Sequence, residues 1–296
     1  MKDLYRNWIL ASRPWSFTMT LMSVGVGSAI AAADGVFHWG LFIATLIGAV
    51  CLHAATNLLN DYHDVKSGVD TDAVATAKYR PHPLLEKKLE LRAVARVAYA
   101  LFLVGAIIGV WLALERGWPV LLIGALGVLA GIAYTAPPVK YKHFGFGELS
   151  VFLMWGPLMV EGTYYVQQQS LSWRAFWVSI PFGLLVGLVI LANNLRDCEY
   201  DNKKDVRTLA VMLGGKGGFY LYSGLVVTAY FCILLMVLIG ILPIWSLAVL
   251  LSLPLAIKLF RVMSRKIPDD ADARTAQINT VFGILLIASL LVEVWI

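Results

Sequence analysis

The chain of 296 residues is too apolar to form the surface of a soluble protein. Hydrophobic residues make up 59% of it and charged residues 15%, and the mean hydropathy is +0.74, whereas soluble domains carry about 25% charged residues. This composition predicts an integral membrane protein and excludes a soluble enzyme, a secreted disulfide scaffold and a disordered tail protein. The three cysteines are widely spaced and form no CxxC pair, so neither a disulfide framework nor a zinc site is indicated.

Nine apolar stretches are long enough to cross a bilayer, which takes about 20 residues of helix. The predicted spans are 15–33, 38–58, 94–114, 118–136, 147–167, 175–195, 218–240, 242–260 and 277–296. Turn-forming pairs such as Asp34-Gly35 and Pro137-Pro138 separate them. The first stretch is long and lacks a cleavage site followed by a polar region, so we expect a span rather than a cleaved signal peptide.

The basic residues orient the predicted helices. Nine spans put the termini on opposite sides, and a cytoplasmic N-terminus leaves 22 of the 24 Lys and Arg residues inside, with only Arg116 and Arg174 outside. This follows the positive-inside rule. The net charge of +5 therefore reflects topology and anionic headgroups, and no nucleic-acid partner is indicated. We expect a multi-pass protein of the inner (plasma) membrane with its N-terminus and long polar loops in the cytoplasm.

Two similar acidic motifs follow the second and the sixth predicted spans. Each places an asparagine and two aspartates near the predicted cytoplasmic end of a helix: Asn60, Asp64 and Asp70 in the first, and Asn193, Asp197 and Asp201 in the second. In both motifs the first aspartate follows the asparagine by four residues, which puts the two side chains on one helix face. The last step of the first motif is longer, and Ser67-Gly68 predicts that the helix ends there and lets the loop fold Asp70 back.

Carboxylate and amide oxygens are the ligands that hard cations prefer, and Mg²⁺ typically takes one or two carboxylates plus phosphate oxygens. Two such motifs facing each other predict a site where Mg²⁺ ions bind a diphosphate, while loop cations take the remaining phosphate charge. The loop cations include Lys66, Arg80, Lys140, Lys142 and Arg207. Acidic residues at a helix C-terminus oppose the helix dipole, so their occurrence at both helix ends argues against ordinary solvated loop charges.

A cation-coupled transporter is the alternative from another class, because transporters also carry intramembrane polar groups and internal repeats. Transporters, however, place their ionisable groups near the bilayer midplane on broken helices. Here the acids gather at helix ends beside loop cations, which favours a bound diphosphate over a permeating ion. A purely structural scaffold would need neither motif.

At these two motifs the sequence resembles the UbiA superfamily of intramembrane prenyltransferases, and Arg13-Pro14-Trp15 and Tyr134-Thr135-Ala136-Pro137-Pro138 are similar to further family features. The likeness covers residues 1–296 as one domain. It implies an all-α polytopic membrane protein with nine transmembrane helices around a central cavity and an active site at the cytoplasmic side. It also implies Mg²⁺-dependent transfer of the prenyl group of a polyprenyl diphosphate to an aromatic acceptor within the lipid bilayer.

The resemblance also implies roles for individual residues. The Mg²⁺ ligands would be Asn60, Asp64, Asp70, Asn193, Asp197 and Asp201, and the four aspartates among them would be catalytic. The residues that bind the substrates would be Lys66, Arg80, Tyr134, Lys140, Lys142, Asn193 and Arg207.

The spacing within the first motif resembles the menaquinone branch of the family. Gly68 stands where the 4-hydroxybenzoate branch tends to carry an acid, and the next acid is Asp70. This implies prenylation of 1,4-dihydroxy-2-naphthoate with decarboxylation, in menaquinone biosynthesis. The tract 77–85 departs from the commonest pattern of that branch, so 4-hydroxybenzoate, homogentisate, 1,4-dihydroxy-6-naphthoate and a lipid precursor stay open as acceptors. The sequence leaves the oligomeric state open as well.

Overall fold

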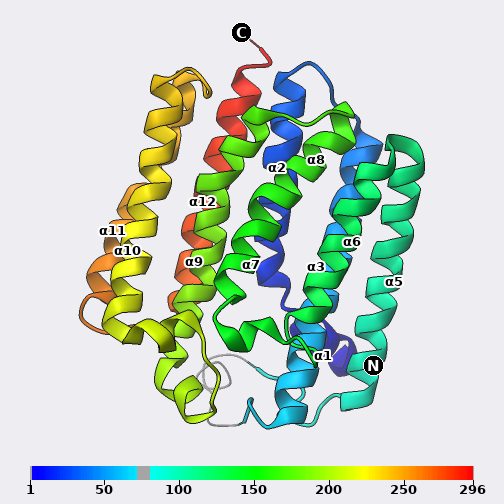
Figure 1. The fold of residues 1–296 in the computed structure, drawn as a ribbon, viewed down its shortest axis with the longest axis vertical. Helices are drawn as coiled ribbons and strands as arrows, with labels where there is room; N and C mark the ends of the chain where they lie inside the picture. Colours follow the sequence, from blue (N-terminus) through cyan, green and yellow to red (C-terminus); the bar gives the residue numbers. More distant parts are fainter. Residues whose placement is uncertain (1, 72–80, 296) are drawn as a thin grey trace.

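Long helices run side by side along the longest axis of the molecule in the computed structural model, which describes residues 2–71 and 81–295 (Figure 1). Within these two ranges the regular structure is entirely helical. In chain order the elements are α1 (Lys2–Ser12), η1 (Pro14–Ser16), α2 (Phe17–Ala33), α3 (Trp39–Ser67), α5 (Leu91–Arg116), α6 (Trp118–Ala133), η2 (Tyr141–Phe144), α7 (Gly147–Leu153), η3 (Met154–Leu158), α8 (Met159–Gln168), α9 (Trp173–Lys203), α10 (Leu209–Leu238), η4 (Ile244–Ser252), α11 (Leu253–Met263) and α12 (Ala271–Val292).

Each of the nine predicted spans corresponds to a helical segment, and the predicted all-α polytopic membrane fold is confirmed. In the described part of the chain, seven helices are long and apolar enough to cross a membrane, and α6 is a shorter apolar helix. The two ends of the chain lie at opposite ends of the bundle, with α1 at the lower end of Figure 1 and the end of α12 at the upper end.

The fifth predicted span is broken in the middle rather than continuous. The backbone leaves helical geometry at Gly156 (φ −82°, ψ −107°), and Pro157 follows within the π-helical turn η3. Proline has no N–H to donate and clashes with the preceding turn, which interrupts a helix. The break coincides with a close approach of two helices, because a Cβ on Gly156 would lie 3.0 Å from the Cα of Gly183 on α9. It lets α7 pack on α9 while α8 packs on α2.

Both acidic motifs lie on helices that continue beyond the predicted spans. α3 runs on to Ser67 and α9 to Lys203, because polar residues end an apolar run without ending a helix. Gly68 caps α3 in the left-handed conformation (φ 73°), and its N–H donates to carbonyls of the last turn, so the predicted helix end at Ser67-Gly68 is confirmed. Both helix ends lie at the lower end of the bundle, the same end as α1 (Figure 1).

A cavity of about 650 Å³ lies inside the bundle, as the resemblance implied. It extends from Asn60 and Asn193, at the end that carries the motifs, to Val120 and Val166 deeper in the bundle, and most of its lining is apolar. The described lining residues come from Arg13, from the elements η1 to α9 and from α12. α10 and α11 pack outside, against α9 and α12.

Candidate active site

Hydrogen bonds hold the ends of α3 and α9 together, so the two acidic motifs face each other. The Tyr200 hydroxyl donates to the carbonyl of Val69 at 2.6 Å and lies 2.9 Å from Thr71 Oγ1. Lys204 Nζ donates to the carbonyl of Gly68 at 2.9 Å. The loop after α3 therefore rests on the last turn of α9.

The carboxylates of the two motifs share one electrostatic environment. Asp201 interacts with Asp197 on its own helix and, across the gap, with Asp64, Asp70 and Lys142. Like charges brought this close disfavour one another unless cations lie between them. Positive charge is therefore needed between the carboxylates, and two side chains of the protein, the half-buried Lys142 and the buried Arg196, supply part of it.

Lys142 supplies positive charge at the first motif. It reaches in from η2, and its Nζ donates to Asn60 Oδ1 at 2.9 Å and to Asp64 Oδ2. Asn60 and Asp64 are both buried. Burial alone would lower the pKa of Lys142, but the Asp64 carboxylate beside it raises that pKa above its ordinary value. Lys142 therefore stays an ammonium ion.

Arg196 does the same at the second motif. Its Nε and Nη2 donate to the two oxygens of Asp197 at 3.0 and 2.6 Å, and Nη2 also donates to Asn193 Oδ1 at 2.7 Å. Nη1 donates to Asp272 Oδ1 at 3.1 Å, at the start of α12. Neither Arg196 nor Asp272 was predicted from the sequence as a site residue, although Arg196 stands within the second motif, directly before Asp197.

The donor set fits a hard divalent cation. All the candidate ligands of the two motifs offer carboxylate or amide oxygens, which suit Mg²⁺. Asp64 Oδ1 is buried and accepts no hydrogen bond from the described residues. His143 Nε2 lies 3.8 Å from this oxygen. A buried carboxylate oxygen that accepts no hydrogen bond is costly in a protein interior, and a bound cation would satisfy it.

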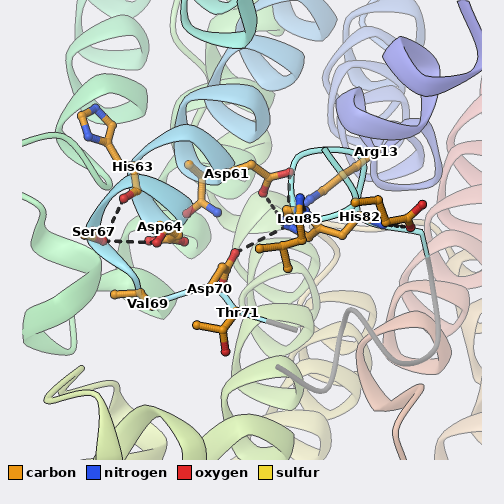
Figure 2. A network of polar contacts seen from close by, with 12 residues as sticks. Arg13, Asp61, His63, Asp64, Ser67, Val69, Asp70, Thr71, His82 and Leu85 are labelled. Atoms are coloured by element: carbon orange, nitrogen blue, oxygen red, sulfur yellow. Dashed lines mark hydrogen bonds and ion pairs between the residues drawn. The ribbon is translucent and has the colours of Figure 1, made fainter. Parts of the chain in front are cut away.

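Asp70 lies between this cluster and a second polar network (Figure 2). His82 Nε2 is 3.6 Å from Asp70 Oδ2 and 3.9 Å from Asp61 Oδ2, and Arg13 forms an ion pair with Asp61. The backbone N–H of Leu85 donates to His82 Nδ1 at 3.4 Å, which leaves Nε2 to carry the ring proton. His82 Nε2 thus faces the two carboxylates, and His82 links Asp70 to the Arg13 pair.

Replacing Arg13 by glutamine is expected to destabilise the protein by about 3 kcal/mol, because a buried carboxylate then loses its charged partner. The Asp61 side chain is only 3% exposed. Thermal unfolding in detergent measures the effect. The double variant Arg13→Gln/Asp61→Asn removes both charges and should recover most of the lost stability, and an unchanged unfolding temperature in the single variant would contradict this assignment.

The other predicted phosphate-binding cations lie at the rim or beyond the described residues. Lys66 is exposed and donates to the Tyr62 hydroxyl at 3.1 Å. Lys140 is exposed, and its side chain forms no hydrogen bond or ion pair with a described residue. Arg207 is exposed too, and its backbone N–H donates at 3.2 Å to the loop that carries Lys142. Arg80 lies outside the described residues.

Tyr134 and Asn193 line the cavity beside the acidic cluster. The rings of Tyr134 and Tyr141 meet edge to face with centroids 5.5 Å apart, and Lys142 Nζ lies 6.0 Å from the Tyr134 centroid. The cavity next to the motifs is thus bounded by an aromatic face and an amide.

A patch of polar side chains from η1 and α3 also lines the cavity. Asn57 Nδ2 donates to Ser16 Oγ at 3.1 Å, and His53 Nε2 lies 3.2 Å from the same oxygen. His53 Nδ1 lies 2.8 Å from Thr20 Oγ1. These groups offer hydroxyl, amide and imidazole contacts in a cavity that is otherwise apolar, which suits a ring with polar substituents.

Comparison with known proteins shows to which family the chain belongs. A model of the UbiA prenyltransferase family matches residues 20–287. The chain belongs to this family. This UbiA-family member is therefore a membrane prenyltransferase, as the two acidic motifs predicted.

Individual relatives support the same assignment over nearly the whole chain. The 1,4-dihydroxy-2-naphthoate octaprenyltransferase of Bacillus subtilis is 30% identical over 286 residues, covering 95% of this chain and 91% of the relative. The UbiA prenyltransferase domain-containing protein 1 of Dictyostelium discoideum is 32% identical over 285 residues, covering 93% and 84%. A UbiA homologue from Archaeoglobus fulgidus, solved with GPP and Mg²⁺, superimposes with a TM-score of 0.72 over 98% of this chain and 100% of its own. At 13% identity that likeness shows the shared fold.

Proposed function

We propose that this UbiA-family enzyme transfers a polyprenyl group to 1,4-dihydroxy-2-naphthoate, with loss of the acceptor carboxylate as CO₂, in menaquinone biosynthesis. The observation that carries the proposal is the pair of Asn/Asp motifs held face to face at the mouth of an apolar cavity of about 650 Å³. The spacing of the first motif, with Gly68 at the helix end, favours the naphthoate as acceptor. The activity named for the Bacillus subtilis relative supports the same choice.

The two motifs would hold Mg²⁺ through Asn60, Asp64, Asp70, Asn193, Asp197 and Asp201. Bound there, Mg²⁺ supplies Lewis-acid stabilisation of the departing diphosphate. The Archaeoglobus fulgidus homologue solved with GPP and Mg²⁺ supports this use of the site. Lys142 stands beside Asn60 and Asp64, so its ammonium moves to a diphosphate oxygen as the donor enters. Lys66, Lys140 and Arg207 would meet the diphosphate at the rim.

The transfer breaks the bond between the allylic carbon of the donor and the diphosphate oxygen, which leaves with the electron pair. The acceptor ring attacks the allylic carbon, and the bonding pair released with CO₂ restores the aromatic ring. As the diphosphate leaves, positive charge develops on the allylic carbon. The apolar cavity excludes water that would otherwise react with this allylic cation, and Tyr134 offers an aromatic face to the same cation. The polar patch of Ser16, His53 and Asn57 would contact the hydroxyl groups of the acceptor.

We place the motif end of the bundle in the cytoplasm, in the inner (plasma) membrane. The distribution of basic residues supports this orientation. At the opposite end of the described bundle, Arg116 and Arg174 both have partners within the protein. Arg116 donates to the carbonyls of Val166 and Gln167 at 2.7 and 2.6 Å. Arg174 forms ion pairs with Asp34, at 3.3 Å, and with Glu293.

Arg80→Ala is expected to raise the KM for the donor about tenfold and to leave the KM for the acceptor unchanged. The reason is that a hydrogen bond to a charged group contributes about 1.5–3 kcal/mol, and this guanidinium would serve the diphosphate alone. Steady-state kinetics with each substrate varied in turn measures the effect, and Lys87→Ala, an exposed cation nearby in the sequence, is the control. Unchanged donor KM and kcat would remove Arg80 from the site.

The acceptor assignment is tested with purified protein in nanodiscs, Mg²⁺ and a polyprenyl diphosphate. 1,4-Dihydroxy-2-naphthoate and 4-hydroxybenzoate are offered side by side at equal concentration, and the products are identified by mass. We expect a product that has gained the prenyl group and lost CO₂, from the naphthoate only. Prenylated hydroxybenzoate that keeps its carboxylate, or diphosphate release with neither product, would contradict this acceptor.

A further inference from the structure

A basic groove on α11 takes no part in the site described above. It encloses about 680 Å³, and we call it the α11 groove. Its lining combines apolar and cationic side chains: Pro254, Ile257, Lys258, Arg261, Val262, Arg265 and Lys266. None of these residues lines the central cavity, so the two spaces are separate.

The groove exists because α11 has two unlike faces. One face buries Ala256, Leu259 and Met263, which recur at the spacing of a single helix stripe. Phe260 stacks on Phe219 of α10, with ring centroids 5.4 Å apart, which fixes the rotation of α11. The remaining face, with its cations, is therefore directed away from the protein core.

The four cations of the α11 groove have no acidic partner among residues 2–71 and 81–295. The side chains of Lys258, Arg261, Arg265 and Lys266 are exposed, and they form no hydrogen bond or ion pair with a described residue. Arg274, in the neighbouring helix, is paired with Asp270. Two of these cations, Lys258 and Arg261, lie on the last turns of α11, and Arg265 and Lys266 follow directly after its end. Four unpaired positive charges this close in the chain repel one another, so an anion placed among them would be stabilised.

The groove also lies at the right level for a lipid headgroup. The segment Ile244–Met263 is apolar and long enough to cross a membrane, and the cations occur at its end. The start of α12, just beyond them, is tied through Asp272 to Arg196 in the acidic cluster. The cations therefore stand at the end of the bundle that carries the motifs, and Pro254 and Ile257 lie deeper along the helix.

We propose that the α11 groove binds an anionic phospholipid of the surrounding bilayer. The phosphate would lie among the four cations, since guanidinium groups bind phosphate with paired hydrogen bonds, and an acyl chain would lie along Pro254 and Ile257. Basic pockets at the ends of membrane helices are suited to anionic headgroups. A polyprenyl diphosphate offers similar chemistry, but the groove is separate from the cavity in which a donor would react, which favours a resident lipid.

The test uses the full chain in nanodiscs that contain phosphatidylcholine with or without phosphatidylglycerol, and native mass spectrometry counts the retained lipids. The groove variant is K258Q/R261Q/R265Q/K266Q. The matched control, K87Q/R92Q/R96Q/K216Q, removes four exposed charges elsewhere. We expect the preference for phosphatidylglycerol to fall about tenfold in the groove variant and to persist in the control. Equal retention in all three proteins, or an equal loss in both variants, would overturn the proposal.

A second arm separates the lipid from the donor. Polyprenyl diphosphate is titrated against bound phosphatidylglycerol, and prenyl transfer is assayed in phosphatidylcholine alone. We expect the donor to leave the lipid bound and the groove variant to keep wild-type transfer and unfolding temperature in that bilayer. Displacement of the lipid by the donor, with a raised donor KM in the groove variant, would assign the groove to the donor and overturn the lipid assignment. Because transfer is measured separately, failure here is distinct from failure of the proposed function.

Discussion

Replacing Asp64 or Asp197 by asparagine should lower the kcat of prenyl transfer about 10³-fold or more. Each change removes a carboxylate from the proposed cation site, where Lewis-acid stabilisation of the leaving diphosphate contributes several kcal/mol, and about 1.4 kcal/mol corresponds to a tenfold change in rate. Steady-state assays at saturating donor, acceptor and Mg²⁺ measure the effect. Raising the Mg²⁺ concentration should restore part of the activity, which a purely structural role would not allow.

Glu199→Gln is the matched control for these variants. Glu199 lies on the same turn of α9 as Asp197 but is exposed, so the loss of its charge should leave kcat within about twofold of the wild type. The unfolding temperature of each variant is measured alongside, because Asp64 and Asp197 also pair with Lys142 and Arg196. A folded Asp64→Asn or Asp197→Asn protein with normal turnover would remove that motif from the cation site.

Replacing Lys142 by methionine should raise the affinity for Mg²⁺ and lower kcat/KM for the donor. In the structure its ammonium neutralises Asp64, so its removal should tighten Mg²⁺ binding to the donor-free enzyme. The same change removes a cation from the proposed diphosphate site, so kcat/KM for the donor should fall about 100-fold, the effect of about 3 kcal/mol. Calorimetry of Mg²⁺ binding and donor kinetics measure the two effects.

Lys140→Met provides the comparison for Lys142. Lys140 is two residues away on the same loop, is exposed and pairs with no described residue, so both quantities should change much less. Weaker Mg²⁺ binding in Lys142→Met, or unchanged donor kinetics, would contradict the two roles assigned to Lys142. An equal effect of Lys140→Met would show that only the overall charge of the loop matters.

What could be predicted from the sequence depends on local patterns. Apolar runs predict the membrane helices because a bilayer demands length and hydrophobicity together. The four-residue step from Asn60 to Asp64 places both on one face, and Gly68 predicts the helix end that the structure contains. The Gly156-Pro157 break was missed because the apolar run continues through it, and its partner Gly183 lies on another helix.

The charge partners could not be predicted, because they depend on contacts between distant segments. Lys142 was predicted to bind the diphosphate, but its position on Asn60 and Asp64 follows from how η2 folds back over α3. The role of Arg196 was not predicted, because one of its partners, Asp272, belongs to α12 and is distant in the sequence. Contacts of this kind are fixed by tertiary packing, and the spacing of residues along the chain does not reveal them.

The most direct test of the central claim is metal-dependent product formation by the purified protein in nanodiscs. Polyprenyl diphosphate and 1,4-dihydroxy-2-naphthoate are supplied with EDTA, and Mg²⁺ is then added in excess, with product followed by mass and diphosphate release followed in parallel. We predict no product before Mg²⁺ is added, and afterwards equal amounts of diphosphate and prenylated, decarboxylated product in the wild type but not in Asp64→Asn. Product formation in EDTA, or equal activity in Asp64→Asn, would contradict the assignment of the paired motifs as the cation site.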